Sequence, residues 1–204
     1  MLYALVCSIF TIYLRLFTRW RVVGADRMPR QGAVIVCANH YHWMDPVVIA
    51  CANRRRQIHF MAKDELFRIR ILAFLFRLVN AYPVKRGAAD RSAVKTTLTL
   101  LEKGNVVGIF PEGTRSRTGE LGKGEPGIGL FAHRTRATIV PVGIAGSYRP
   151  FRRITVVYGE PMRFEQAYEQ KLKSDELQRA ITEPVMAEVA ALRAAAKATL
   201  QGTD

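Results

Sequence analysis

Short, nearly continuous apolar runs alternate with helical patterns along this chain. Six of the runs are rich in β-branched residues and predict strands covered on both faces, because such strands show no regular polar alternation. They lie at residues 20–25, 33–38, 58–62, 105–110, 138–144 and 154–159. The alternation of strands with helices predicts an α/β domain with a mostly parallel or mixed central sheet flanked by helices.

Three further stretches predict helices, at residues 46–53, 90–103 and 174–199. Pro46 suits the first turn of the first helix, and Asp90 is a candidate N-cap of the second. The third carries its apolar residues on one stripe, and Pro184 inside it predicts a break or a kink. Such helices would supply the layers that cover the sheet.

The first fourteen residues are uncharged and mostly apolar. A bilayer span needs roughly 20 apolar residues, and the run has neither the basic start nor the cleavage site of a secretory signal. Arg15, Arg19 and Arg21 follow it, which suits shallow insertion with arginines at the lipid headgroups. We therefore predict a membrane-associating helical segment at 1–19 and one α/β domain at 20–204. The alternative is a helix docked on the protein's own core.

The segment 64–79, DELFRIRILAFLFRLV, is apolar around most of its circumference. Arg68, Arg70 and Arg77 are interspersed along it. It predicts either a core helix whose arginines reach outward or a second helix on the membrane surface.

The charge of the chain favours a polyanionic partner. Among its 204 residues, 31 lysines and arginines against 17 acids give a formal charge of +14. Basic clusters at 53–57 and 148–153 make a polyanion-binding module an alternative function. No nucleic-acid-binding motif accompanies them, so no nucleic acid partner is expected. The three cysteines form no C-x-x-C pair, so neither a disulfide framework nor a metal site is expected.

Two histidines and an aspartate follow a predicted strand in the stretch VCANHYHWMD. The carboxyl ends of strands in open α/β sheets face the usual ligand site. A turn that folds Asp45 back beside His40 would let the carboxylate accept the Nδ1 proton and leave Nε2 as a general base. An aspartate before a proline is also an ordinary helix cap. His42 competes with His40, and the spacing alone leaves these alternatives open.

A second polar stretch, IFPEGTRSRTGE at 109–120, also follows a strand. Its small residues and arginines predict a loop rich in N–H donors that favours a phosphate or a developing oxyanion. Arg115 can bind phosphate through two N–H groups, and Glu112 can hold a guanidinium or a substrate hydroxyl. A plain surface turn is the alternative. The chain has no G-x-S-x-G elbow, which argues against a serine-nucleophile hydrolase.

These stretches give the chain a resemblance to the 1-acylglycerol-3-phosphate acyltransferases, a family of glycerolipid acyltransferases. NHYHWMD at 39–45 resembles the family's N-H-x-x-x-x-D block, and FPEGTRS at 110–116 resembles its third block. YPVKRG at 82–87 and IVPVGI at 139–144 resemble the second and fourth blocks. The blocks stand in the family's order within residues 20–165.

The resemblance implies that His40 rather than His42 is the general base and that Asp45 is its partner. It also implies a substrate site for the glycerophosphate at Asn39, Lys63, Arg86, Glu112, Gly113, Thr114 and Arg115. The chain departs from the family at two positions. Glu125 stands where a lysine is frequent, and Asn80 stands where a glycine is common.

The implied reaction transfers an acyl group from acyl-CoA or acyl carrier protein to the sn-2 hydroxyl of 1-acyl-glycerol 3-phosphate, giving phosphatidic acid. The acyl donor is a co-substrate, and no cofactor or metal is implied. Glycerol 3-phosphate or another lysolipid is an alternative acceptor. The expected partners are the lysophospholipid, the donor and an anionic membrane surface, with the protein peripheral or monotopic on the cytoplasmic face of the cell membrane.

Overall fold

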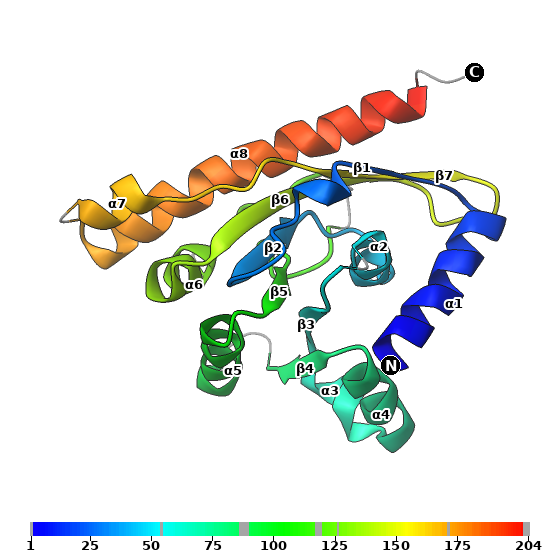
Figure 1. Ribbon diagram of the computed structural model, residues 1–204, viewed down its shortest axis with the longest axis horizontal. Coiled ribbons are helices and arrows are strands. Elements are labelled where there is room, and N and C mark those ends of the chain that lie inside the picture. Colours follow the sequence, from blue (N-terminus) through cyan, green and yellow to red (C-terminus); the bar gives the residue numbers. More distant parts are fainter. Residues whose placement is uncertain are drawn as a thin grey trace.

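A seven-stranded sheet forms the centre of the computed structural model, which describes residues 2–53, 55–85, 90–116, 120–125, 127–170 and 172–201 (Figure 1). The strands are β1 (Arg19–Val23), β2 (Val34–Ala38), β3 (Ile58–Lys63), β4 (Ala81–Val84), β5 (Val106–Ile109), β6 (Thr138–Gly146) and β7 (Arg153–Tyr158). Their order across the sheet is β1-β7-β6-β2-β5-β3-β4. All neighbours pair in parallel except β6 and β7, which are antiparallel. The predicted α/β fold with a mostly parallel or mixed sheet is confirmed.

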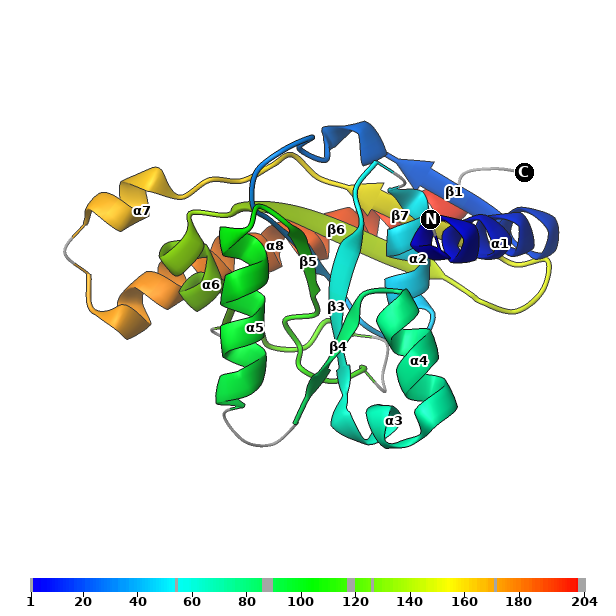
Figure 2. The same ribbon diagram turned by 60° about the horizontal axis from the view of Figure 1, so that its bottom comes forward.

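Helices cover both faces of this sheet (Figures 1 and 2). One apolar cluster joins the sheet to α1 and α2, and a second joins it to α5, α6 and α8. The helices are α1 (Leu2–Phe17), α2 (Asp45–Ala52), α3 (Asp64–Arg68), α4 (Arg70–Leu78), α5 (Arg91–Glu102), α6 (Gly127–Thr135), α7 (Glu165–Glu169) and α8 (Ser174–Gln201), with a 3-10 turn η1 (Ala25–Arg27).

Strand β2 shows why its sequence is a continuous apolar run. Val34, Val36 and Ala38 belong to the cluster beneath α1 and α2. Ile35 and Cys37 point the other way, into the cluster beneath α5, α6 and α8. Because alternate side chains enter two different cores, every position of this strand is buried.

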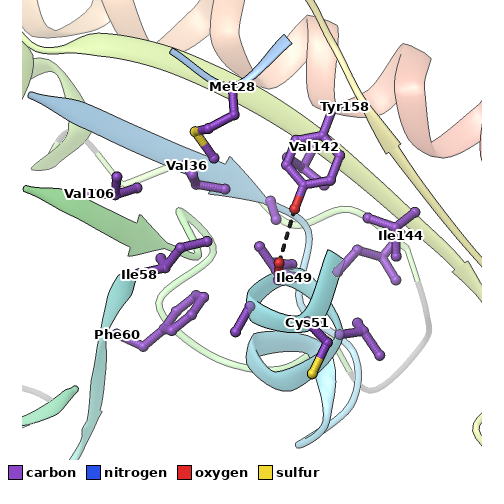
Figure 3. Packing of buried hydrophobic residues seen from close by; sticks show 14 of the residues in the cluster. Met28, Val36, Ile49, Cys51, Ile58, Phe60, Val106, Val142, Ile144 and Tyr158 are labelled. Atoms are coloured by element: carbon purple, nitrogen blue, oxygen red, sulfur yellow. Dashed lines mark hydrogen bonds between the residues drawn. The ribbon is translucent and has the colours of Figure 1, made fainter. Parts of the chain in front are cut away.

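A buried hydrogen bond ties α2 to the sheet. The Tyr158 hydroxyl, at the end of β7, donates to the Ile49 carbonyl oxygen of α2 at 3.0 Å (Figure 3). Both side chains lie in the same fully buried cluster. Burial raises the pKa of the Tyr158 phenol far above its ordinary value, so it stays a donor. The bond fixes the helix that begins at Asp45.

Strand β4 and helix α8 differ from the predictions for reasons of packing. Strand β4 was not predicted, and it contains Pro83. It lies at the edge of the sheet, where a missing N–H interrupts no ladder on the outer side. Of the break or kink predicted at Pro184, the break is wrong, because α8 runs unbroken through this residue, while the kink stays a prediction. The apolar stripe of α8 packs along the sheet on both sides of the proline and keeps the helix continuous.

The segment 64–79 forms two helices instead of one. Ile69 separates α3 from α4 with φ −87° and ψ 113°, an extended conformation. After α4 the chain turns at Asn80, whose φ is 59°. Glycine and asparagine adopt this left-handed region most readily, which explains why asparagine can stand where the resemblance leads us to expect glycine.

Helix α1 has two apolar faces. Tyr3, Cys7 and Leu14 are buried against the core, while Leu5 and Ile9 on the opposite face are more than half exposed. The core-docked alternative is therefore correct for one face and leaves the other face free. Within the described ranges, no helix is both long and apolar enough to cross a bilayer. Separating 1–19 from 20–204 stays a prediction, since α1 shares a core with the rest of the chain.

Candidate active site

The polar stretches predicted from the sequence meet at the carboxyl ends of the parallel strands. We call this end of the sheet its carboxyl edge. Strands β4, β3, β5, β2 and β6 are parallel to one another, so their carboxyl ends lie together. His40 follows β2, the loop Pro111–Arg115 follows β5, and Lys63 ends β3. Open α/β sheets bind ligands beyond the carboxyl ends of their strands, at the point where the strand order reverses.

Asp45 folds back on the turn that precedes it. Its Oδ2 lies 2.8 Å from His40 Nδ1 and accepts the backbone N–H groups of Tyr41 and His42, each at 2.7 Å. Asp45 is the first residue of α2, yet the cap position is Met44 and no side chain caps the helix. The simple N-cap alternative is therefore wrong, and the carboxylate is the partner of the histidine.

This arrangement selects the tautomer of the His40 ring. The carboxylate of Asp45 can only accept, so the facing Nδ1 carries a proton. Nε2 is then the ring nitrogen that can accept a proton. The His40 side chain is 10% exposed, and its ring stacks on Phe110 with ring centroids 4.1 Å apart. A buried, stacked and carboxylate-bound imidazole has its orientation fixed before substrate arrives.

His42 has a different environment. Its Nδ1 accepts the backbone N–H of Met44 at 3.2 Å, and its ring stacks on Tyr148 at 4.2 Å. Burial lowers the pKa of His42, and the nearby charges of Arg115 and His40 act in the same direction, against the raising effect of Asp45. The geometry thus favours His40, which alone of the two has a ring nitrogen on the Asp45 carboxylate.

Tyr148 is a member of the site that the sequence did not single out. Its hydroxyl donates to Asp45 Oδ1 at 2.6 Å, so both carboxylate oxygens are engaged. Burial, and next the adjacent Asp45 charge, raise the pKa of the Tyr148 phenol well above its ordinary value, and the hydroxyl stays protonated. The sequence showed Tyr148 only as the start of a basic cluster, because nothing local links it to a residue 103 positions away.

Glu112 binds the F-P-E-G-T-R loop to the backbone of His40. Its Oε1 accepts the His40 N–H at 2.7 Å, and its Oε2 accepts the Gly122 N–H at 2.9 Å. On the other side of the same residue, the Ser116 N–H donates to the His40 carbonyl oxygen at 2.8 Å. The resemblance assigns Glu112 to the substrate. In this structure both of its oxygens bind backbone, which makes it an organiser of the loop.

Asn39 has a comparable structural role. Its Nδ2 donates to the Ile144 carbonyl oxygen at 3.0 Å, and its Oδ1 accepts the Ile144 N–H at 2.7 Å. The side chain is buried at 2% exposure and joins the end of β2 to β6. We expected a substrate contact at Asn39. In this structure its amide fixes the backbone from which His40 projects, and the substrate contact stays a prediction.

The remaining expected substrate residues that the structure describes lie at the same edge. Gly113, Thr114 and Arg115 are exposed, and Gly113 has a φ of 66°, a turn that favours glycine. Lys63 is exposed and forms an ion pair of 3.0 Å with Glu65. Arg86 lies outside the described residues. The exposed side chains therefore leave the loop after β5 open to a ligand beside the buried His40–Asp45 pair.

Comparisons with known proteins identify the family of this chain. Residues 19–145, more than half of the chain, match the model of the Acyltransferase family. A 1-acyl-sn-glycerol-3-phosphate acyltransferase of Bacillus subtilis is 31% identical over 168 residues, which cover 80% of this chain and 82% of that protein. The enzyme of the same name from Streptococcus pneumoniae is 33% identical over 148 residues, 67% of this chain and 54% of its own length.

A solved structure shares the fold. The 1-acyl-sn-glycerophosphate acyltransferase PlsC of Thermotoga maritima superimposes with a TM-score of 0.65 at 24% identity, over 86% of this chain and 74% of that one. The family model spans the His40 turn, the loop after β5 and most of β6, the segments that build the site. The chain is therefore an enzyme of the acyltransferase family.

Proposed function

We propose that this enzyme transfers an acyl group from a thioester donor, acyl-CoA or acyl carrier protein, to the sn-2 hydroxyl of 1-acyl-glycerol 3-phosphate. The product is phosphatidic acid. The 2.8 Å contact between His40 Nδ1 and Asp45 Oδ2 carries the proposal, because it prepares Nε2 as a general base. The relatives from Bacillus subtilis and Streptococcus pneumoniae are both named for acylation of this acceptor.

The proposed step is a direct transfer. Nε2 of His40 removes the proton of the acceptor hydroxyl, and the oxygen attacks the thioester carbonyl carbon. The tetrahedral intermediate collapses, the C–S bond breaks, and the thiolate leaves with the proton returned from Nε2. Asp45 stabilises the transient imidazolium through Nδ1. General-base assistance of this kind contributes about 10²–10⁴-fold to the rate.

The acceptor phosphate is proposed to bind at the exposed end of the loop after β5. Arg115 has a planar guanidinium suited to two phosphate oxygens, and the Thr114 hydroxyl and backbone N–H groups lie beside it on the same loop. Lys63 stands at the end of β3, a neighbour of β5 in the sheet. These cations would hold the glycerol backbone near His40, and such positioning is a large part of catalysis.

The proposed location is the cytoplasmic face of the cell membrane, where both thioester donors occur and the lipid acceptor is embedded. The free face of α1 carries Leu5, Ile9, Ile12 and Leu16, each more than half exposed. An apolar helix face of this kind, followed by arginines, suits shallow insertion into an anionic leaflet. Because the other face of α1 is in the core, its membrane role is tested with substitutions on the free face and not by deletion.

An acceptor comparison tests the proposal. We expect the purified enzyme to acylate 1-acyl-glycerol 3-phosphate faster than glycerol 3-phosphate and faster than a lysolipid without a terminal phosphate monoester. Each acceptor would be assayed with acyl-CoA and with acyl carrier protein at equal donor concentration. A greater kcat/KM with glycerol 3-phosphate would mean that the enzyme acylates glycerol 3-phosphate itself, the alternative acceptor. Equal rates on all the lysolipids would contradict a phosphate-selective site.

Arg115→Ala is expected to raise the KM for the phosphorylated acceptor by about ten- to hundredfold, since one charge-assisted contact is worth about 1.5–3 kcal/mol. The KM for the acyl donor should change much less, because the loss is confined to acceptor binding. Arg179→Ala, the same charge change on the exposed surface of α8, is the control. Steady-state kinetics with each substrate varied in turn separate the two constants. An effect on the donor alone would refute this assignment.

A further inference from the structure

Helix α4 carries an exposed apolar crest, which we define as Ile71, Phe74 and Leu75. These side chains are 68%, 59% and 50% exposed. They stand at positions i, i+3 and i+4, so they share one face of the helix. Three large hydrophobic side chains on one face of a nine-residue helix form a contiguous patch. Contiguous patches, unlike single exposed hydrophobic residues, mark interaction surfaces.

The fold does not need this crest for its own core. Ala73 on the opposite side of α4 is buried, and the ring of Phe76 lies 5.7 Å from that of Phe67 in α3. These contacts already fix α4 against the rest of the chain. The crest is therefore free to bind something else.

The charges around the crest select an anionic partner. Arg70 and Arg77 are both exposed, and they stand seven residues apart, about two helical turns, on a line that flanks the crest. Helix α4 itself contains no acidic residue. The acids of the preceding helix are paired, Glu65 with Lys63 at 3.0 Å and Asp64 with Arg68 at 3.5 Å. An apolar stripe bordered by arginines suits the boundary between acyl chains and anionic headgroups.

The position of α4 relates it to both the active site and α1. Helix α3 begins directly after β3, at the carboxyl edge where His40 lies, and α4 follows α3. In both views the N-terminal end of α1 lies next to α4 (Figures 1 and 2). The two exposed apolar faces therefore belong to helices that are neighbours in the fold.

We propose that α4 is a second membrane-binding element, with its crest among the acyl chains of an anionic leaflet and Arg70 and Arg77 among the headgroups. This inference rests on the proposed function, which supplies a membrane-borne acceptor. One helix alone leaves the protein free to rotate about its axis. Contact through both α1 and α4 fixes the orientation of the molecule and holds the carboxyl edge of the sheet beside the leaflet that contains the acceptor.

Site-directed labelling tests this contact in the full-length protein. Cys7, Cys37 and Cys51 are buried, so a cysteine introduced at an exposed position can be labelled selectively with a polarity-sensitive dye. The three variants are Ile71→Cys on the crest, Ile9→Cys on α1 and Ala194→Cys on the exposed surface of α8. Vesicles of equal parts phosphatidylglycerol and phosphatidylcholine should enhance and blue-shift the emission at 71 and 9, and leave the emission at 194 unchanged.

The outcomes separate this inference from the proposed function. A response at 9 without one at 71 would overturn the role of α4 and leave membrane binding by α1 intact. A response at 71 in an enzyme that acylates no lysophosphatidic acid would support the surface and refute the proposed activity. Emission at 71 that rises with protein concentration in the absence of lipid would assign the crest to a second copy of the chain and overturn the proposal.

A paired substitution supplies the functional readout. Phe74→Gln combined with Leu75→Gln should weaken sedimentation with the same vesicles by about tenfold or more, because two apolar side chains lose their burial in lipid. Turnover of vesicle-borne acceptor should fall with it, while turnover of a short-chain monomeric acceptor stays unchanged. Equal loss on both acceptors would place the crest in the active site or the fold and refute the membrane contact.

Discussion

Replacing His40 with alanine is expected to lower kcat by about 10²–10⁴-fold, the contribution of a positioned general base. The fold should survive the change. The contacts that bind the loop to this residue use the His40 backbone N–H and carbonyl oxygen, which alanine retains. The Asp45 carboxylate keeps three donors, from Tyr41, His42 and Tyr148. Single-turnover rates and a thermal melt on the same preparation measure both effects.

His42→Ala is the matched control for this variant. Both substitutions remove an imidazole from the same turn. The ring of His42 stacks on Tyr148 and accepts a backbone N–H, whereas the ring of His40 contacts the Asp45 carboxylate. We expect His42→Ala to keep more than a tenth of the wild-type kcat. If His42→Ala loses activity while His40→Ala keeps a tenth of it, the base has been assigned to the wrong histidine.

The strands and the edge that bears the site could be predicted from the sequence, because both follow from local patterns. Runs such as Val34–Ala38 are apolar at every position and read as buried strands. Polar stretches directly after two such strands predict a site at their carboxyl ends. The exception is strand β4, whose cause lies in the tertiary structure. Pro83 argues against a strand, and only its place at the sheet edge makes β4 possible.

The partners of the polar side chains could not be predicted, because they depend on which backbone groups the loops leave unpaired. Asn39 and Glu112 stand in the expected blocks, yet their side chains bind the backbone of Ile144, His40 and Gly122. Nothing in the local spacing distinguishes an amide that binds backbone from one that binds substrate. Tyr148 lies beyond the family-model match, which ends at residue 145, and it reaches the site only because β6 lies next to β2.

The nature of α1 was undecided in the sequence for a physical reason. A helix that is apolar on all sides is compatible with a protein core and with a lipid surface. The structure divides it, with Leu14 fully buried on one face and Leu16 at 65% exposure on the other. The same division applies to α4, with Ala73 inside and Ile71 outside. Hydrophobicity alone does not say which face meets which partner.

Asp45→Asn is expected to reduce kcat by about 10²–10⁴-fold, because a neutral amide no longer stabilises the imidazolium that forms on His40. The turn itself should persist. An amide oxygen in the place of Oδ2 still accepts from His40, Tyr41 and His42, and the amide nitrogen in the place of Oδ1 can donate to the Tyr148 oxygen. The free energy of unfolding should fall by only about 1–3 kcal/mol, the difference between charge-assisted and neutral hydrogen bonds.

Tyr148→Phe separates the charge of Asp45 from its surroundings. This variant removes the donor to Oδ1 and keeps the carboxylate against His40, so kcat should fall by about tenfold or less, with the KM of both substrates nearly unchanged. The order of activity is then wild type, Tyr148→Phe and Asp45→Asn, although both variants lose stability to a similar degree. An Asp45→Asn enzyme that keeps more than a tenth of wild-type kcat, with an unchanged melt, would mean that Asp45 serves the turn alone. Nε2 of His40 would then act as a base without a carboxylate partner.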